Sequence, residues 1–321
     1  MTLLTSPASF AQAADAQPSP EDTINALNGV FGRHAKERSS HAKGFCAAGQ
    51  FIPSPHGRDF STTPLFQGSA MPVTARFSIG GGNPKASDKG RSVRGLGVRF
   101  HLPNEEELDL VMISAPVFFA ANPAQFVEFL KVRTADPATG QKDPAKIKAF
   151  NEANPNVMAH LNYVSKTPPP ASYATAPYFS THAFLFEDHG VEERAARWSV
   201  EPVGGFEGLT KEQEETFPDS FLEQELRDRL VRGPAQWEIS LQVAEVGDPL
   251  NDPTAVWPDS RRKVNVGRLV IDRVVEKGAD DDCTGFVFDP NNLPTGIGPT
   301  DDPILAIRNP AYGVSFGRRS E

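Results

Sequence analysis

A series of short apolar stretches, separated by Gly, Pro and Asn residues, constrains the fold of this chain more than any other feature of its sequence. Four of these stretches lie at residues 45–51, 73–79, 97–102 and 108–113. Each has the length of a β-strand and is apolar throughout or alternates apolar with polar residues. A second set lies at residues 182–186, 195–202, 236–245 and 264–275. Short strands at such close spacing are typical of an antiparallel barrel or sandwich.

Helices are predicted between and beside these strands. Residues 21–33 have the apolar spacing of a short amphipathic helix. Further helices are predicted at residues 123–131, 147–163 (with an interruption near Pro155) and 221–231. No internal repeat or low-complexity tract divides the chain. We therefore predict an α+β fold in which residues 21–321 form one domain, an antiparallel β-barrel with flanking helices.

Composition and charge exclude several classes of function. The 32 basic and 41 acidic residues give a net charge of −9, which argues against a nucleic-acid partner because binding to phosphates needs clustered Lys and Arg. No apolar run approaches the roughly 20 residues that a membrane-spanning helix needs. Cys46 and Cys283 can form at most one bridge and belong to no Cys-x-x-Cys pair, which excludes a zinc ribbon and a disulfide scaffold.

The first twenty residues are small and uncharged up to Asp15 and include an Ala-Gln-Ala-Ala stretch that a signal peptidase could cleave. No basic residues precede the short apolar stretch, however, so a flexible start fits equally well. We expect residues 1–20 to be a flexible segment or the remnant of an export signal. Localisation therefore stays open, with the periplasm or export slightly favoured over the cytoplasm.

Motifs for two other chemistries fail on their context. Residues 313–317 read Gly-Val-Ser-Phe-Gly, but a nucleophile elbow needs a following helix and a later acid and His, and only four residues remain after Gly317. The seven histidines include no His-Glu-x-x-His or His-x-His pair. A zinc or iron centre held by protein side chains alone is therefore not predicted.

A set of motifs in a fixed order points to one family. Residues 31–44 reproduce the pattern Phe-x-Arg-x-x-x-Glu-Arg-x-x-His-Ala-Lys-Gly, and residues 308–312 read Arg-Asn-Pro-Ala-Tyr. Between them, further matching segments follow at residues 74–78, 94–100, 116–119, 256–258, 266–270 and 288–294. From residue 31 to residue 319 the sequence thus resembles the haem catalase superfamily, and in particular its short catalase-related peroxidases. The resemblance implies a haem-binding core without the extra C-terminal domain, and haem b, with its iron, as cofactor.

The resemblance also implies how the cofactor is held. Tyr312 would be the metal ligand, and because a phenol ionises only near pH 10 in water, Arg308 one helical turn earlier would supply a cation that favours the phenolate. Both haem propionates need cations, and bidentate arginine suits carboxylate geometry. The residues that would bind the propionates or pack flat on the haem are Arg38, Arg76, Arg319 and Phe126.

On the opposite haem face the resemblance implies two catalytic residues. His41 would take a proton from the bound peroxide and return it to the departing oxygen. Ser78 would accept a hydrogen bond from the other ring nitrogen of His41 and so fix its orientation. The pattern breaks at Ile113, which stands where catalases carry an Asn that helps to polarise the peroxide; Ser114 could replace it if the register slips by one residue.

These features predict a haem peroxidase that uses hydrogen peroxide or organic hydroperoxides to oxidise small organic electron donors, with weak catalase activity. No nucleic acid and no membrane span are expected, and the short chain suggests a small assembly such as a homodimer. One alternative is a fatty-acid hydroperoxide isomerase of the allene oxide synthase type, which the 22 phenylalanines would suit. The other is a non-catalytic haem-binding protein, against which an oriented distal base argues.

Overall fold

An antiparallel β-barrel forms the centre of the computed structural model, which describes residues 17–190 and 193–320. Eight strands close the barrel in the order β1, β2, β3, β4, β5, β7, β8, β9, and β9 returns to β1. Two short strands, β6 and β10, extend from β7 outside this ring. The barrel strands are β1 (Gly44–Pro53), β2 (Met71–Ile79), β3 (Arg94–His101), β4 (Glu107–Ile113), β5 (Tyr178–Phe179), β7 (Glu193–Pro202), β8 (Ala235–Val243) and β9 (Lys263–Val274); the two extensions are β6 (Phe184–Glu187) and β10 (Ile297–Pro299).

Side chains fill the interior of the barrel. Successive residues of a strand point to opposite faces, so every second side chain of β2 and β3 enters the core. Phe77 lies at the centre, with ring centroids of Tyr173, Tyr178 and Trp237 between 5.2 and 6.3 Å away. Because the interior is packed in this way, a ligand cavity of any size has to lie outside the barrel wall.

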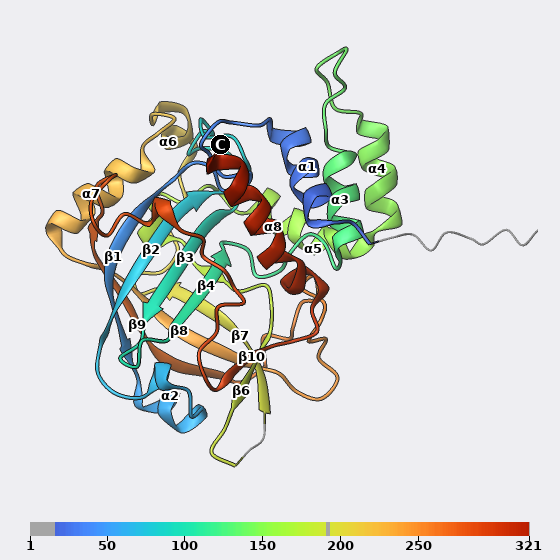
Figure 1. The fold of residues 1–321 in the computed structure, drawn as a ribbon. Helices are drawn as coiled ribbons and strands as arrows, with labels where there is room; N and C mark the ends of the chain where they lie inside the picture. Colours follow the sequence, from blue (N-terminus) through green and yellow to red (C-terminus); the bar gives the residue numbers. More distant parts are fainter. Residues whose placement is uncertain (1–16, 191–192, 321) are drawn as a thin grey trace, which may run out of the picture.

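Helices cover the outside of the barrel in two groups (Figure 1). Helix α8 lies across strands β2–β4 and contacts α1 and α3, which pack together through an apolar cluster that includes Ile24, Leu27 and Leu130. Helices α6 and α7 lie near the opposite edge. The helices are α1 (Pro20–Phe31), α2 (Pro55–Phe60), α3 (Pro123–Lys131), α4 (Pro144–Ala153), α5 (Met158–Lys166), α6 (Lys211–Thr216), α7 (Leu222–Arg232) and α8 (Pro303–Ser320), with single 3₁₀ turns η1 (Pro64–Phe66), η2 (Pro155–Val157), η3 (Tyr173–Thr175) and η4 (Cys283–Gly285).

The predicted barrel and all the predicted strands and helices are confirmed, most of them within a few residues of the expected bounds. The interruption near Pro155 is also confirmed, since α4 and α5 are separated there by η2. Most elements that the strand and helix patterns did not predict are short: α2, α6, β5 and β10 have six residues or fewer. The exception is α8, an 18-residue helix of which only the turn from Arg308 to Tyr312 was expected, through the family resemblance. Helix α6 buries no residue, so it lacks the apolar periodicity on which such predictions depend.

Helix α1 has a capping box that determines where it begins. The Ser19 hydroxyl accepts a hydrogen bond from the Asp22 amide, and the Asp22 carboxylate accepts one from the Ser19 amide. Residues 1–16 of the predicted flexible or signal segment lie outside the described residues. Within the described part of the chain, no helix is both long and apolar enough to cross a lipid bilayer.

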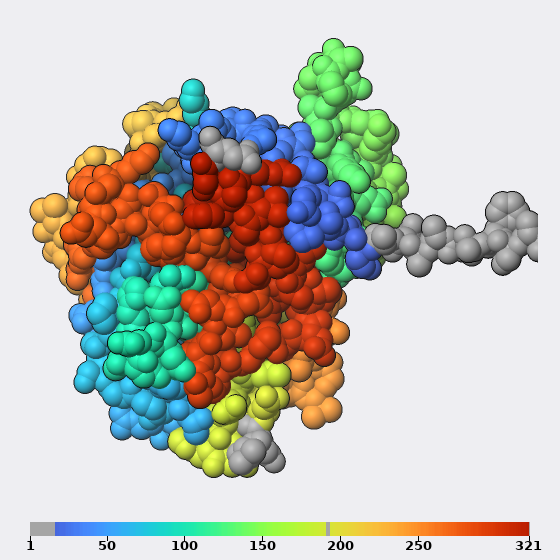
Figure 2. Space-filling view, viewed as in Figure 1, coloured from blue at the N-terminus to red at the C-terminus, as the bar shows by residue number. Residues whose placement is uncertain are grey.

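A disulfide bond joins Cys46 of β1 to Cys283 of η4, two residues separated by 237 positions in the sequence. Both are buried, with 3% and 0% of their surfaces exposed. The single bridge that the two cysteines allow is therefore formed. It attaches the segment before α8 to the barrel, and Figure 2 shows that this segment (orange) adjoins α8 (red) on one face of the molecule.

Removing this bridge should lower the stability of the whole domain. A cross-link that closes so long a loop restricts the unfolded chain, and losing such a bond typically costs about 2–5 kcal/mol. We expect the double variant Cys46→Ser/Cys283→Ser to unfold at lower urea concentration than the oxidised wild type. Dithiothreitol should destabilise the wild type alone; equal midpoints for both proteins, with and without dithiothreitol, would contradict the expectation.

Candidate active site

One cavity lies between the outer face of strands β2–β4 and helix α8. The outward face of the strands is open there because it carries Ser78 on β2, and Gly95 and Gly97 on β3. A Cβ at Gly97 would lie 3.0 Å from the Phe288 ring, so a larger residue would displace part of the cavity lining. All eight residues singled out in the sequence line this cavity, namely Arg38, His41, Arg76, Ser78, Phe126, Arg308, Tyr312 and Arg319.

His41 reaches the cavity from the loop between α1 and β1. Its backbone has φ of 53°, in the left-handed region that non-glycine residues rarely adopt. Arg76 holds this conformation in place, because its guanidinium donates hydrogen bonds to the carbonyls of His41 (3.0 Å) and Ala42 (3.2 Å). The His41 ring lies 3.0 Å from the Ser78 hydroxyl through Nδ1. Gly95 permits this contact, since a Cβ there would lie 2.5 Å from both His41 Nδ1 and Ser78 Oγ.

The electrostatic surroundings keep His41 neutral. Burial is the main cause, and together with the positive charges of Arg76, Arg308 and Arg38 it lowers the pKa of His41 to about 3. A group with so low a pKa carries no proton on its free ring nitrogen at neutral pH. His41 is therefore able to accept a proton there.

Three arginines, Arg38, Arg76 and Arg319, form a cationic cluster in the lining of the cavity, and the charge of Glu37 offsets it only from a distance. Burial lowers the pKa of Arg38 to about 9, with the charges of Arg76 and Arg319 adding to the effect, and burial lowers that of Arg76 to about 10. Arg38 and Arg319 donate hydrogen bonds to the same acceptor, the carbonyl of Phe286, at 3.0 and 3.1 Å. Among residues 17–190 and 193–320, none of the three has a carboxylate within ion-pair distance. A buried cluster of this kind needs an anionic ligand.

Tyr312 and Arg308 lie on the other side of the cavity, one turn apart on α8. Arg308 donates two hydrogen bonds to the Tyr312 hydroxyl, from Nε at 2.9 Å and from one terminal nitrogen. The guanidinium thus holds the phenol oxygen in place at the lining of the cavity. A phenol oxygen is one of the protein groups that can bind a ferric haem iron.

Phe126 contributes a flat apolar wall. It begins the second turn of α3, and its ring stacks with those of Phe118 and Phe119 at centroid distances of 6.1 and 5.4 Å and interplanar angles of 10° and 26°. This arrangement suits one face of a planar aromatic group.

Ile113 and Ser114 are the two residues considered for the position at which catalases carry an Asn. Ile113 lines the cavity, whereas Ser114 does not. The Ser114 hydroxyl accepts a hydrogen bond from the Arg94 amide at 2.8 Å, and the Ser114 amide donates to the Arg94 carbonyl. Strands β3 and β4 pair Gly95 with Ile113, so Ile113 shares the cavity face with Gly95. Ser114 does not reach the cavity, so the structure offers no support for Ser114 in the place of the Asn.

The sequence did not single out a second buried pair beside the cavity. His182 Nδ1 lies 2.7 Å from the Asp302 carboxylate, and Asp302 also caps α8 by accepting hydrogen bonds from the amides of Ile304 and Leu305. Burial lowers the pKa of His182, although the hydrogen bond to Asp302 opposes the shift. No local motif marks these two residues, which are 120 positions apart, so only the fold brings them together.

Comparison with known proteins agrees with this geometry. The model of the Catalase family matches residues 24–319. The chain is 38% identical over 302 residues to a catalase-related peroxidase of Synechococcus elongatus, covering 94% of this chain and 88% of that protein. It is 32% identical to a catalase-related peroxidase of Mycolicibacterium paratuberculosis, covering 94% and 95% of the two chains. A fungal catalase and catalase A of Saccharomyces cerevisiae share the fold, with TM-scores of 0.80 and 0.79 at 21% identity, covering 99% and 98% of this chain and 66% and 68% of theirs.

The chain belongs to the catalase family, whose members depend on haem and act on peroxide. Within this family it is an enzyme of the catalase-related peroxidase kind. The chemical groups that line the cavity fit a haem. The cavity offers an oxygen ligand on one side, a flat apolar wall, and unpaired arginines where two carboxylates would lie.

The low pKa of His41 predicts how the reaction with peroxide depends on pH. Because the pKa is lowered to about 3, His41 stays neutral as the pH falls from 8 to 5, and the rate should stay nearly constant. A histidine with the ordinary pKa of about 6.5 would lose roughly 30-fold over the same range. Stopped-flow measurement of the haem absorption after mixing with peroxide gives this profile.

The variant His41→Ala provides the control. It should retain haem but react about 10²-fold more slowly, the usual scale for a positioned acid-base group. A wild-type rate that halves near pH 6.5, or a variant as fast as the wild type, would show that a neutral His41 is not the proton acceptor.

Proposed function

We propose that this protein is a haem b peroxidase that uses hydrogen peroxide or organic hydroperoxides to oxidise small organic donors, with weak catalase activity. One observation carries the proposal: the His41–Ser78 pair and the Arg308–Tyr312 pair line the same cavity, the latter from helix α8. A protein that only carried or sensed haem would have no use for an oriented, neutral base opposite the ligand.

The proposal gives the cavity residues their tasks in holding the cofactor. The Tyr312 oxygen would bind the iron, and Arg308 would hold that oxygen in place through its two hydrogen bonds. Arg38, Arg76 and Arg319 would bind the two propionates, and Phe126 would pack on the porphyrin plane. When bound, the haem supplies the oxidising chemistry that the side chains lack.

His41 would move the proton that cleavage of the peroxide O–O bond requires. With Nδ1–H donating to the Ser78 hydroxyl, Nε2 is free to accept the proton from one peroxide oxygen and to return it to the other. That second oxygen then leaves as water, or as an alcohol when the substrate is an organic hydroperoxide. Over a full cycle, one hydroperoxide and two reduced donors give one alcohol, one water and two donors oxidised by one electron each.

Ile113 supports the choice of a peroxidase over an efficient catalase. Release of oxygen requires that a second hydrogen peroxide be held and oxidised by two electrons. The aliphatic side chain of Ile113 cannot donate a hydrogen bond to it. Oxidation of a small donor by single electrons makes no such demand, so it should compete well.

The ligand assignment predicts a loss of haem from Tyr312→Phe, because this change removes the anionic ligand. Arg308→Leu should weaken retention less, since the phenol remains but loses the two hydrogen bonds that hold its oxygen in place. The measurement is the haem-to-protein ratio and the absorption spectrum after gel filtration. Tyr163→Phe on α5 is the matched control and should change neither; full occupancy and an unaltered spectrum in Tyr312→Phe would defeat the assignment.

The role of Ile113 predicts that Ile113→Asn shifts the products towards oxygen. We expect the ratio of evolved oxygen to oxidised phenolic donor to rise, because the amide can orient a second peroxide. Ile113→Leu should leave the ratio unchanged. Vigorous oxygen release with negligible donor oxidation in the wild type would make the protein a small catalase, and conversion of a fatty-acid hydroperoxide without any donor would favour the isomerase alternative.

A further inference from the structure

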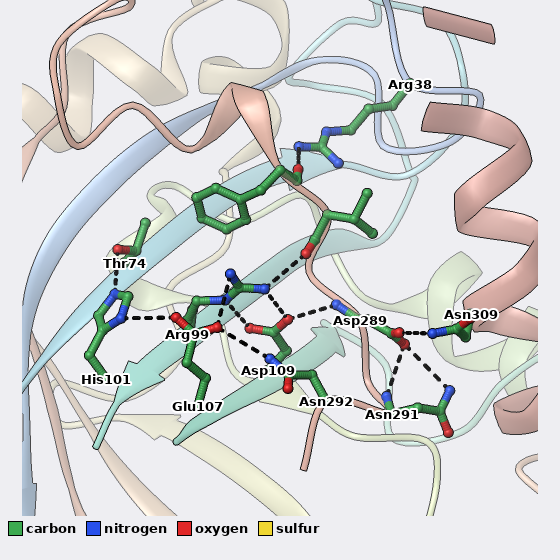
Figure 3. Close-up of polar contacts among 12 residues, drawn as sticks. Arg38, Thr74, Arg99, His101, Glu107, Asp109, Asp289, Asn291, Asn292 and Asn309 are labelled. Atoms are coloured by element: carbon green, nitrogen blue, oxygen red, sulfur yellow. Dashed lines mark hydrogen bonds and ion pairs between the residues drawn. The ribbon is translucent and has the colours of Figure 1, made fainter. Parts of the chain in front are cut away.

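Residues 286–293, the loop that follows η4, connect the barrel wall to both sides of the cavity. Arg38 and Arg319, which are 281 positions apart in the sequence, both donate to the Phe286 carbonyl. Figure 3 shows the contact of Arg38 with the loop and, separately, the series of polar contacts from Arg99 through Asp109 and Asp289 to Asn309; the peptide chain from residue 286 to residue 287 joins the two. The positions of both arginines therefore depend on what holds this loop.

Arg99 of β3 holds the beginning of the loop. Its guanidinium lies 4.5 Å from the centroid of the Phe286 ring and donates to the Val287 carbonyl at 3.1 Å. Two further hydrogen bonds, of 2.7 and 2.6 Å, join it to both carboxylate oxygens of Asp109. Arg99 and Asp109 are direct partners in the pairing of β3 with β4. The barrel register thus places a bidentate ion pair under the loop.

Asp109 holds the middle of the loop through its own backbone and side chain. Its carboxylate accepts a hydrogen bond from the Asp289 amide at 2.9 Å, and its amide donates to the Asn292 carbonyl at 3.0 Å. Only 1% of Asp109 is exposed. Burial raises the pKa of this carboxyl while Arg99 opposes the rise, so the charge of Arg99 is what makes the buried carboxylate tolerable.

The last of these polar contacts join the loop to α8, the helix that carries Tyr312. The Asp289 carboxylate accepts a hydrogen bond from the side chain of Asn309, and Asn291 donates to the Leu305 carbonyl at 3.1 Å. Helix α8 needs such support because Pro310 lacks the amide hydrogen that would continue the helical bonding. Asn309 stands directly between Arg308 and Pro310.

We propose that Arg99 and Asp109 are positioning residues for the carboxylate-binding arginines. The pair sets the place of the Phe286 carbonyl and so the distance between Arg38 and Arg319, and through Asp289 it braces α8. This inference rests on the proposed function, because it takes the propionates as the anions that these arginines bind. Arg99 does not bind them itself, since its charge is already matched by Asp109 and by Glu107 at 3.1 Å.

The test measures the contribution of the arginines to porphyrin binding separately from that of the iron ligand. It uses iron-free protoporphyrin IX, which has both carboxylates but cannot bond to Tyr312. Binding to the haem-free full chain is followed by fluorescence. We expect Asp109→Asn to bind protoporphyrin IX about tenfold more weakly than the wild type, the scale of one lost hydrogen bond to a charged group. Protoporphyrin IX dimethyl ester, which has no free carboxylate, should bind both proteins equally.

Glu238→Gln is the matched control. Glu238 and Arg268 form the same kind of outward cross-strand ion pair between β8 and β9, and neither lines the cavity. This variant should leave the affinity for both porphyrins unchanged. Arg99→Lys, which keeps the charge but loses the two-pronged contact, should weaken binding of the diacid by a smaller factor, and it decides the question if Asp109→Asn does not fold.

The outcomes distinguish the two proposals. Equal affinity of Asp109→Asn and Glu238→Gln for protoporphyrin IX would overturn the positioning role and leave the proposed function intact. Equal weakening of the diacid and the ester would also overturn it, since that result indicates a general loosening of the cavity. A wild-type protein that retains neither haem nor protoporphyrin IX would overturn the proposed function and this inference together.

Discussion

The closed, filled barrel is the constraint on which the rest of the structure depends. Its interior is occupied by aromatic side chains such as Phe77 and Trp237, so the barrel contributes to a site only through its outward side chains, and loops and helices supply the rest. Along β3 those outward positions are Gly95, Gly97 and Arg99, two that leave room and one that carries charge. Because successive side chains of β3 point to opposite faces, one face of this strand both leaves space for the cavity and carries Arg99, which pairs with Asp109.

Charge couples the cavity to its cofactor. Bringing Arg38, Arg76 and Arg319 together out of water is costly, because burial and mutual repulsion disfavour their charged forms. A dianionic porphyrin would relieve this repulsion, so binding should stabilise the fold by mass action. The same positive field and burial keep His41 neutral, which means that one arrangement of arginines serves both cofactor binding and proton transfer.

The segment before α8 is attached to the barrel both by a disulfide bond and by an ion pair. The disulfide attaches Cys283 to β1, and the pair of Arg99 and Asp109 fixes the residues that follow it. Both constraints act just before α8, whose Pro310 interrupts the helical hydrogen bonding near Tyr312. These bonds therefore hold the segment that contains the Phe286 carbonyl in place relative to the helix that carries Tyr312.

Local pattern was enough to predict the barrel class and the long strands and helices other than α8, and the eight residues that meet in one cavity came from the resemblance of the sequence motifs to the catalase superfamily. Strand alternation and helical spacing are properties of neighbouring residues, and the motifs around His41 and Tyr312 are contiguous, so the sequence alone carries them. Only the tertiary structure determined that Ser114 turns away from the cavity, that His182 meets Asp302, and that the Phe286 carbonyl receives two arginines. The reason is that these contacts depend on strand register and on chain segments more than 100 residues apart, and neither leaves a local signature.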